Sequence, residues 1–92
     1  MKIVYDPRKN EWNIDKRGLS FDRAVEFDFI GAVHLVDSRK DYGEIRRIAV
    51  GYLDNRLHIL CYTMREQNMH IISFRKANNK EARRYGKPKN TN

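Results

Sequence analysis

The chain has 92 residues, 40% of them hydrophobic, and its 19 Lys and Arg against 12 Asp and Glu give a formal net charge of +7. This length and apolar content predict one small folded domain with a modest core and exclude a disordered polypeptide. The lone cysteine, Cys61, and the lack of a long apolar stretch exclude an internal disulfide, a cysteine-based zinc site, a signal peptide and a membrane span, so we expect a cytoplasmic protein without a cofactor.

A short strand over residues 2–5 and a polar helix are predicted first. Asp6 can cap this helix by accepting a backbone N–H, Pro7 loses no hydrogen bond at the first helical position, and Gly18 suits a left-handed residue at the end. Trp12 is the largest apolar side chain of the helix. We therefore expect Trp12 to anchor the helix on the core.

A second short helix is predicted after Ser20, whose side chain can cap it. The apolar residues that follow recur at helical spacing and should face the core. They are Phe21, Ala24, Val25 and Phe29.

An antiparallel sheet is predicted from the segments that come next. Its strands are expected over residues 33–36, 45–53, 56–65 and 69–75, with a polar loop over residues 37–43. Asp54-Asn55 suits a two-residue hairpin turn, and Glu66-Gln67-Asn68 predicts a second turn.

The C-terminal end is predicted to hold one more helix and a tail. Asn78 and Glu81 have the spacing of a capping box, and Tyr85-Gly86 ends the helix. Residues 87–92 are expected to be disordered. The fold class is therefore α+β, a single domain over residues 1–86 with two N-terminal helices on an antiparallel sheet and a short C-terminal helix.

The two turns predict a strand register. Arg46 should stand opposite Thr63, and Thr63 opposite Ile71. One face then carries Arg46, Thr63, Arg65, Ile71, Ser73 and Arg75. The other carries Arg47, His58, Tyr62, His70 and Phe74. The register leaves open which face the helices cover.

The excess positive charge lies in the C-terminal third of the chain. Residues 64–92 contain eight Lys and Arg and two acidic residues, whereas residues 1–30 contain six of each sign. Charge concentrated in this way favours a polyanionic partner such as nucleic acid, although a solvated charged tail is the simpler alternative.

The sequence resembles the BrnT family of bacterial toxins, which are related to the RelE-type ribonucleases. The resemblance spans roughly residues 2–85 and consists of four blocks in order. The blocks are Tyr5-Asp6-Pro7-Arg8-Lys9 with Asn13; Lys16-Arg17-Gly18-Leu19-Ser20-Phe21; Glu44-Ile45-Arg46 with Gly51; and residues 71–77, Ile-Ile-Ser-Phe-Arg-Lys-Ala, with Glu81, Arg84 and Tyr85. Two positions differ from the family pattern: Arg17 replaces a His, and His70 stands where the family often has Arg.

The resemblance implies a RelE-like fold and metal-independent cleavage of RNA, which would block translation. It also implies neutralisation by a cognate BrnA-like antitoxin, expected in a heterotetramer that reaches DNA only through the antitoxin. Because the guanidinium of Arg17 does not deprotonate in proteins, the acid and base of the reaction stay unassigned at this point.

Four residues are candidates for catalysis. Arg75, at the end of the last predicted strand, is the first candidate for phosphate stabilisation, because its fork can bind two phosphate oxygens; the alternative is an ion pair with Glu81. Arg46 is the second, with an ion pair as its alternative. Glu44 is a candidate general base, although a salt bridge to Arg46 or Arg65 is the favoured alternative. Lys16 rests on the family block, and the negative end of the helix is its alternative reason.

Further residues are candidates for RNA binding or proton transfer. Arg17, Arg65, Arg83, Arg84 and Tyr85 could bind the RNA backbone or stack on a base. His58 and His70 could transfer protons near neutral pH, although a strand histidine is more often structural.

Two other functions stay open. One is a non-catalytic nucleic-acid-binding module, and the other is a protein whose basic face binds an acidic segment of an antitoxin.

Overall fold

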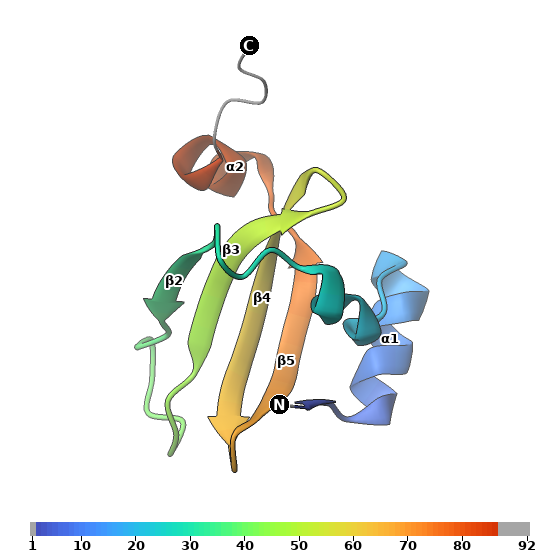
Figure 1. Ribbon diagram of the computed structural model, residues 1–92, viewed down its shortest axis with the longest axis vertical. Coiled ribbons are helices and arrows are strands. Elements are labelled where there is room, and N and C mark those ends of the chain that lie inside the picture. The colour runs from blue at the N-terminus through green and yellow to red at the C-terminus, as the bar shows by residue number, and fades with distance from the viewer. Residues whose placement is uncertain (1, 87–92) are drawn as a thin grey trace.

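The computed structural model describes residues 2–86, which form a five-stranded sheet with helices at its edge and one end (Figure 1). The strand order is β1-β5-β4-β3-β2. The elements are β1 (Ile3–Val4), α1 (Pro7–Arg17), the 3₁₀ helix η1 (Phe21–Glu26), β2 (Val33–Val36), β3 (Arg47–Leu53), β4 (Arg56–Arg65), β5 (Asn68–Lys76) and α2 (Asn79–Tyr85). The tail predicted to be disordered, residues 87–92, lies outside the described residues.

The α+β class is confirmed, with two corrections. The sheet is mixed, not wholly antiparallel, because β1 pairs with β5 in parallel, Ile3 opposite Met69. The second helix is a 3₁₀ helix that ends at Glu26. Within residues 2–86, no helix has the length and apolar character needed to cross a membrane.

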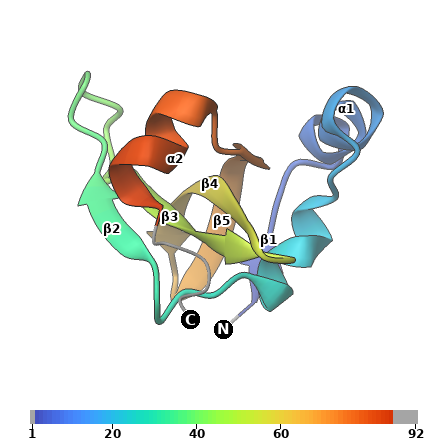
Figure 2. The same cartoon turned by 90° about the horizontal axis from the view of Figure 1, so that it is seen from above.

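Helix α1 begins and ends as predicted, but it packs through polar groups. Asp6 Oδ1 accepts the N–H of Arg8 at 2.9 Å, and Gly18 ends the helix at φ 65°. The prediction that Trp12 anchors the helix is wrong, because its side chain is 52% exposed. The neighbouring Asn13 is buried instead, and its Nδ2 donates to the carbonyl oxygens of Leu19 and Phe74 at 2.9 and 2.8 Å. The helix therefore lies beside the edge of β5 (Figures 1 and 2).

The segment around η1 supplies the apolar cover of one sheet face. Phe21, Ala24 and Phe27 are buried, a spacing of three that matches the three residues per turn of a 3₁₀ helix. Val25, predicted to face the core, is 72% exposed for the same reason. Phe29 follows the helix and packs edge-on against Tyr62, with ring centroids 6.3 Å apart.

Both turns between the last three strands contain two residues. Asp54-Asn55 and Glu66-Gln67 all have positive φ, as such tight hairpin turns require. The predicted second turn was one residue too long, because Asn68 already belongs to β5.

The predicted register is right for β3 with β4 and partly wrong for β4 with β5. Arg47 pairs with Tyr62, the expected alignment. Thr63 pairs with His70, whereas Ile71 had been expected, and Cys61 pairs with Ser73, so Ile72 is skipped. Because of this bulge, the residues of β5 before Ile72 lie on the opposite sheet faces from those predicted. Ile71 therefore lies in the core with Phe74, and His70 lies on the opposite face with Thr63.

The face carrying Arg75 is covered only in part. Helix α2 begins with the predicted capping box of Asn78 and Glu81 and closes one end of this face, where Tyr85 packs on a small apolar cluster. Next to that cluster lies a hollow of about 440 Å³, which we call the open-face hollow. Its lining includes Asp37, Arg39, Val50, Ile59, Cys61, Arg75, Glu81 and Tyr85.

Candidate active site

The predicted site residues fall into two groups at opposite ends of the sheet. Arg75 pairs with Ile59 of β4, whereas Arg46 follows Ile45, whose carbonyl oxygen accepts the Thr63 hydroxyl at 2.7 Å. Thr63 lies four positions after Ile59 on β4, about 13 Å along an extended strand. The structure therefore does not bring Glu44 and Arg46 together with Arg75.

At the Glu44 end, the charged groups neutralise each other. Arg65 donates from Nε and Nη2 to the two carboxylate oxygens of Glu44 at 2.9 and 2.8 Å. These hydrogen bonds lower the pKa of Glu44, which makes its carboxylate a weak base. The guanidinium of Arg46 lies 3.9 Å from the ring centroid of Tyr42. The salt-bridge alternative for Glu44 is thus what the structure contains.

A second ion pair stands at the rim of the open-face hollow. Asp37 is buried and accepts hydrogen bonds from Arg39 Nη2 at 2.7 Å and from the Tyr42 hydroxyl at 3.0 Å. The bonds from Arg39 hold the pKa of the Asp37 carboxyl well below its usual range. Arg39 is therefore committed to a carboxylate that stays ionised.

Arg75 is also paired, yet it remains at the surface of the site. Its Nη1 and Nη2 each donate to one carboxylate oxygen of Glu81 at 2.8 Å. This fork lowers the pKa of Glu81 to about 2. The side chain of Arg75 is 35% exposed and reaches both the open-face hollow and a second hollow at the edge of β5.

This second hollow, the edge hollow, lies where β5 has no strand partner. Strand β1 pairs only with Met69 and His70, and the carbonyl oxygen of Phe74 is bound by α1 instead, by Asn13 at 2.8 Å and Arg17 at 3.4 Å. The hollow measures about 290 Å³ and is lined by Arg17, Leu19, Arg75 and Lys76. Three cationic side chains from α1 and β5 therefore meet at one place.

Lys16 does not join these cations. It forms an ion pair with Asp15 at 3.8 Å, and its side chain is 61% exposed. Its neighbour Arg17, predicted only for RNA binding, lines the edge hollow instead.

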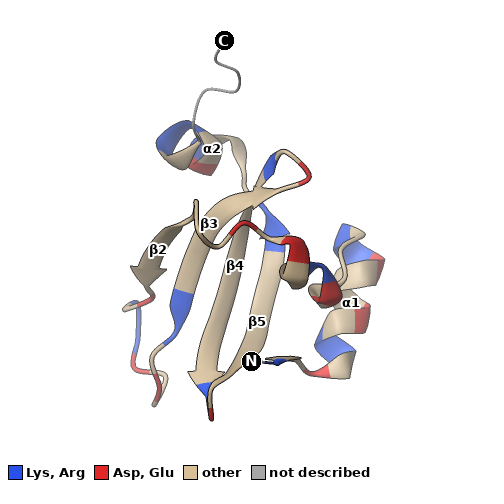
Figure 3. Ribbon diagram, in the orientation of Figure 1, with Lys and Arg blue, Asp and Glu red and all other residues tan. Residues whose placement is uncertain are grey.

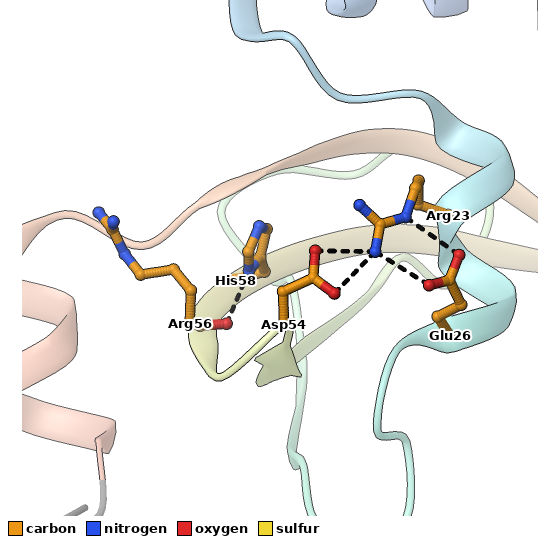
Figure 4. Close-up of polar contacts among 5 residues, drawn as sticks. All are labelled: Arg23, Glu26, Asp54, Arg56 and His58. Carbon is orange, nitrogen blue, oxygen red and sulfur yellow. Dashed lines mark hydrogen bonds and ion pairs between the residues drawn. The ribbon is translucent and has the colours of Figure 1, made fainter.

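A third hollow, the turn hollow, adjoins the edge hollow beside the β3–β4 turn. It measures about 320 Å³ and shares Arg17, Leu19 and Lys76 with the edge hollow. Its other charged or titratable lining residues are Arg23, Asp54, Arg56 and His58. Figure 4 shows Arg23 held between Glu26 and Asp54, with bonds of 2.8 to 3.0 Å.

Three cations around these two hollows are not neutralised. Within residues 2–86, Arg17, Arg56 and Lys76 form no ion pair with a carboxylate. Figure 3 shows that α1 carries basic segments at both of its ends, while basic segments of α2, β5 and the β3–β4 turn lie toward one end of the molecule. This end therefore keeps a positive field that a phosphate group can enter.

His58 is the titratable group of the turn hollow, and the sequence had favoured a structural role for it. The residue is 3% exposed, and its Nδ1 lies 2.7 Å from the carbonyl oxygen of Arg56. Because a carbonyl oxygen only accepts, Nδ1 carries the proton and Nε2 has the lone pair. Burial lowers the pKa of His58, helped by the charges of Arg56 and Lys76. The sequence signal that could have found it is its place just after the Asp54-Asn55 turn.

The predicted RNA-binding residues of α2 differ in exposure. Arg83 and Arg84 are exposed, and the guanidinium of Arg84 lies 5.4 Å from the Tyr85 ring centroid. Tyr85 is half-buried on the apolar cluster under α2 and lines the open-face hollow.

The chain matches one family of known proteins over most of its length. No curated protein sequence matches it significantly. The family model for the ribonuclease toxin BrnT of type II toxin-antitoxin systems matches residues 5–81. That range contains η1, the whole sheet from β2 to β5, and every lining residue of the edge and turn hollows. The chain belongs to the BrnT family of ribonuclease toxins of type II toxin-antitoxin systems.

Proposed function

We propose that this protein is a metal-independent endoribonuclease whose reacting phosphate sits in the edge hollow, against Arg17, Arg75 and Lys76. The observation that supports this site is the meeting of three cationic side chains from α1 and β5 around one hollow of about 290 Å³. Of the candidates for catalysis, Arg75 keeps the leading role. Glu44, Arg46 and Lys16 take no part in the chemistry, since they lie at the other end of the sheet or point to solvent.

The chemistry asks for positioning and fixed positive charge. The 2′-oxygen of one nucleotide attacks its own 3′-phosphorus, and the 5′-oxygen of the next nucleotide leaves, which yields a 2′,3′-cyclic phosphate and a 5′-hydroxyl. The phosphorus centre becomes more anionic and more crowded on the way. Preorganised arginine forks stabilise that charge where it develops, without a metal ion.

Binding of the rest of the RNA strand is assigned to exposed cations beyond the hollow. Arg83 and Arg84 on α2 are exposed and suit contacts to neighbouring phosphates. Arg65 is already paired with Glu44 and adds little. Tyr85 is too buried to stack freely, so its part is the wall of the open-face hollow.

Membership of the family implies a cognate antitoxin as well as an RNA substrate. We propose that the antitoxin covers the cationic end with an acidic segment, in a BrnA-like heterotetramer that contacts DNA through the antitoxin. Expression of the toxin alone would then cleave RNA in the cytoplasm, block translation and arrest growth. A RelE-like relationship would account for helices beside a core of three antiparallel strands.

Antitoxin-free protein incubated with RNA and excess chelator tests the proposal. We expect cleavage with 2′,3′-cyclic phosphate ends, and a fall of about 100-fold in rate for Arg75→Ala, the loss that follows removal of one transition-state donor. Arg47→Ala is the matched control, because Arg47 is an exposed arginine on β3 far from the hollow. Unbroken RNA, or an Arg75→Ala variant as active as the control, would contradict the proposal; RNA binding without cleavage would indicate the non-catalytic module.

A further inference from the structure

We propose that His58 is the general base of the reaction and that its Nε2 takes the proton of the attacking 2′-hydroxyl. This inference rests on the proposed function above. It adds a catalytic residue from β4 to a site otherwise built from α1 and β5.

The ring of His58 is held in one orientation by two contacts. Its Nδ1 donates to the carbonyl oxygen of Arg56 at 2.7 Å, and its face packs against Phe74, with ring centroids 5.6 Å apart. Figure 4 shows the ring standing up from β4 between Arg56 and Asp54, with its second nitrogen away from the Arg56 carbonyl. Nε2 is therefore fixed in place, and no described residue forms a hydrogen bond with it.

The surroundings favour the neutral imidazole, the form that can accept a proton. Burial lowers the pKa of His58, and the charges of Arg56 and Lys76 act in the same direction. The carbonyl of Arg56 and the carboxylate of Asp54 oppose the shift. The remaining charged groups of the hollow are Arg17 from α1 and Arg23 from η1, and Arg23 also binds Asp54. A neutral histidine is a competent general base at neutral pH.

The two adjoining hollows place this base beside the proposed phosphate site. Arg17 and Lys76 line both of them, while Arg75 lines the edge hollow and His58 lines the turn hollow. A phosphate group held by Arg17 and Lys76 would stand between Arg75 on one side and His58 on the other. The ribose that carries the 2′-hydroxyl would extend into the turn hollow, whose volume of about 320 Å³ leaves room for it.

His58 removes one proton in this step, and water supplies the proton for the leaving oxygen. The 2′-oxygen forms a bond to phosphorus while its proton passes to Nε2 of His58, and the bond from phosphorus to the 5′-oxygen breaks. The leaving 5′-oxygen takes a proton from water at the mouth of the hollow. His58 then returns its proton to solvent, so the enzyme is unchanged after each turnover.

Single-turnover cleavage as a function of pH tests the role of His58. In the wild type we expect the rate to fall with acid as His58 becomes protonated. In His58→Gln we expect a rate about 100-fold lower and no acidic limb, because glutamine cannot take the proton. An RNA with a 2′-deoxy nucleotide at the cleavage position binds but is not cleaved. Its Kd for His58→Gln should differ from its Kd for the wild type by less than about threefold, since the phosphate-binding cations remain.

The matched control is His34→Gln on β2. His34 also bonds a backbone carbonyl through its ring, to Phe29 at 2.8 Å, but lies outside both hollows. Its rate and pH profile should match the wild type. If the wild type does not cleave RNA, the proposed function itself is contradicted. If the wild type cleaves RNA and His58→Gln has the same rate and the same acidic limb, only the role of His58 is overturned.

A second measurement uses only the wild-type protein, so it tests the role of His58 even if the His58→Gln variant fails to fold. The imidazole Cε1–H signal of each histidine can be titrated by NMR in the wild-type protein. The apparent pKa of the cleavage profile should equal that of His58. An apparent pKa that differs from that of His58 would overturn the inference.

Discussion

Within residues 2–86, both ends of the sheet carry unpaired cations, such as Arg47 at the Glu44 end, and the ends differ in whether those unpaired cations line a hollow. At the end with Glu44, Arg65 is neutralised by a carboxylate and Arg46 lies on the ring of Tyr42. At the end with the β3–β4 turn, Arg17, Arg56 and Lys76 surround two adjoining hollows without an ion pair in the described chain. Positive charge alone therefore does not mark a phosphate site.

Carboxylates hold arginines at both ends. Asp37 and Glu44 hold Arg39 and Arg65 in bidentate pairs, and Glu81 holds Arg75 in the same way beside the edge hollow. Near the edge and turn hollows, Arg23 forms ion pairs with both Asp54 and Glu26. Within the described chain, Arg17, Arg56 and Lys76 have no carboxylate partner, so a phosphate can bind them without breaking an ion pair, whereas Arg75 must exchange Glu81 for the phosphate.

The largest expected effect separates Arg17 from Arg65. Arg17→Ala should lower the cleavage rate by about 100-fold, because it removes a cation shared by both hollows, whereas Arg65→Ala should change it by less than about threefold. Single-turnover cleavage by both purified variants, with thermal unfolding to confirm the fold, measures the difference. A larger loss for Arg65→Ala would place the chemistry at the Glu44 end.

The next effect concerns the link between α1 and β5. Asn13→Ala should lower the free energy of unfolding by about 2 kcal/mol, because the buried carbonyl oxygens of Leu19 and Phe74 lose their donor. It should also slow cleavage, since Asn13 Oδ1 accepts a hydrogen bond from Arg17 at 3.0 Å. Urea unfolding checks the first expectation. Glu11→Ala, an exposed position on the same helix, should cost far less.

A smaller effect should appear in the salt dependence of RNA binding. Removing Arg56 and Lys76 together should flatten the slope of log affinity against log salt by about 1.4, the share of two phosphate contacts on single-stranded RNA. The control removes Arg47 and Arg65, which takes away the same charge at the other end. Titrations of the two variants with an uncleavable RNA at several salt concentrations measure these slopes. An equal slope change in both variants would show that the two ends do not differ in RNA binding.

The smallest effect is expected from releasing Arg75. Glu81→Gln keeps an acceptor for the Asn78 N–H and so preserves the capping box, but it removes the charge that binds Arg75. Stability at neutral pH should fall by about 1 kcal/mol, and RNA affinity should rise slightly.

The same substitution has a pH signature. The pKa of Glu81 is lowered from 4.5 to about 2, so its contribution is fully present above pH 4.5 and is lost as pH falls toward 2. The decline in wild-type stability over that range should therefore shrink in Glu81→Gln. Urea unfolding at neutral and acidic pH measures it, with Glu66→Gln, an exposed turn position, as control. An unaltered decline would show that this pair contributes nothing.

Local chemistry made much of the fold predictable. Both ends of α1, the Asp54-Asn55 turn and the capping box of α2 each depend on a few adjacent residues, and all of them are confirmed. The bulge at Ile72 was not predictable, because it depends on how β5 fits two partners at once. Phe27 in place of Val25 follows from a 3₁₀ turn, which helical spacing does not reveal.

The site was less predictable for a related reason. Whether an arginine is free depends on carboxylates that are distant in sequence, as with Arg65 and Glu44 or Arg23 and Asp54. The place of His58 just after the Asp54-Asn55 turn was only a weak signal of its role, since its hollow is formed by α1, β5 and the β3–β4 turn together.

Locating the bound RNA phosphate tests the proposed site most directly. Arginine side-chain NMR signals can be followed while an uncleavable RNA is added to the wild-type protein. We expect the largest shifts at Arg17, Arg56 and Arg75, with Arg46 and Arg65 almost unchanged. Shifts confined to Arg46 and Arg65 would contradict the proposed site.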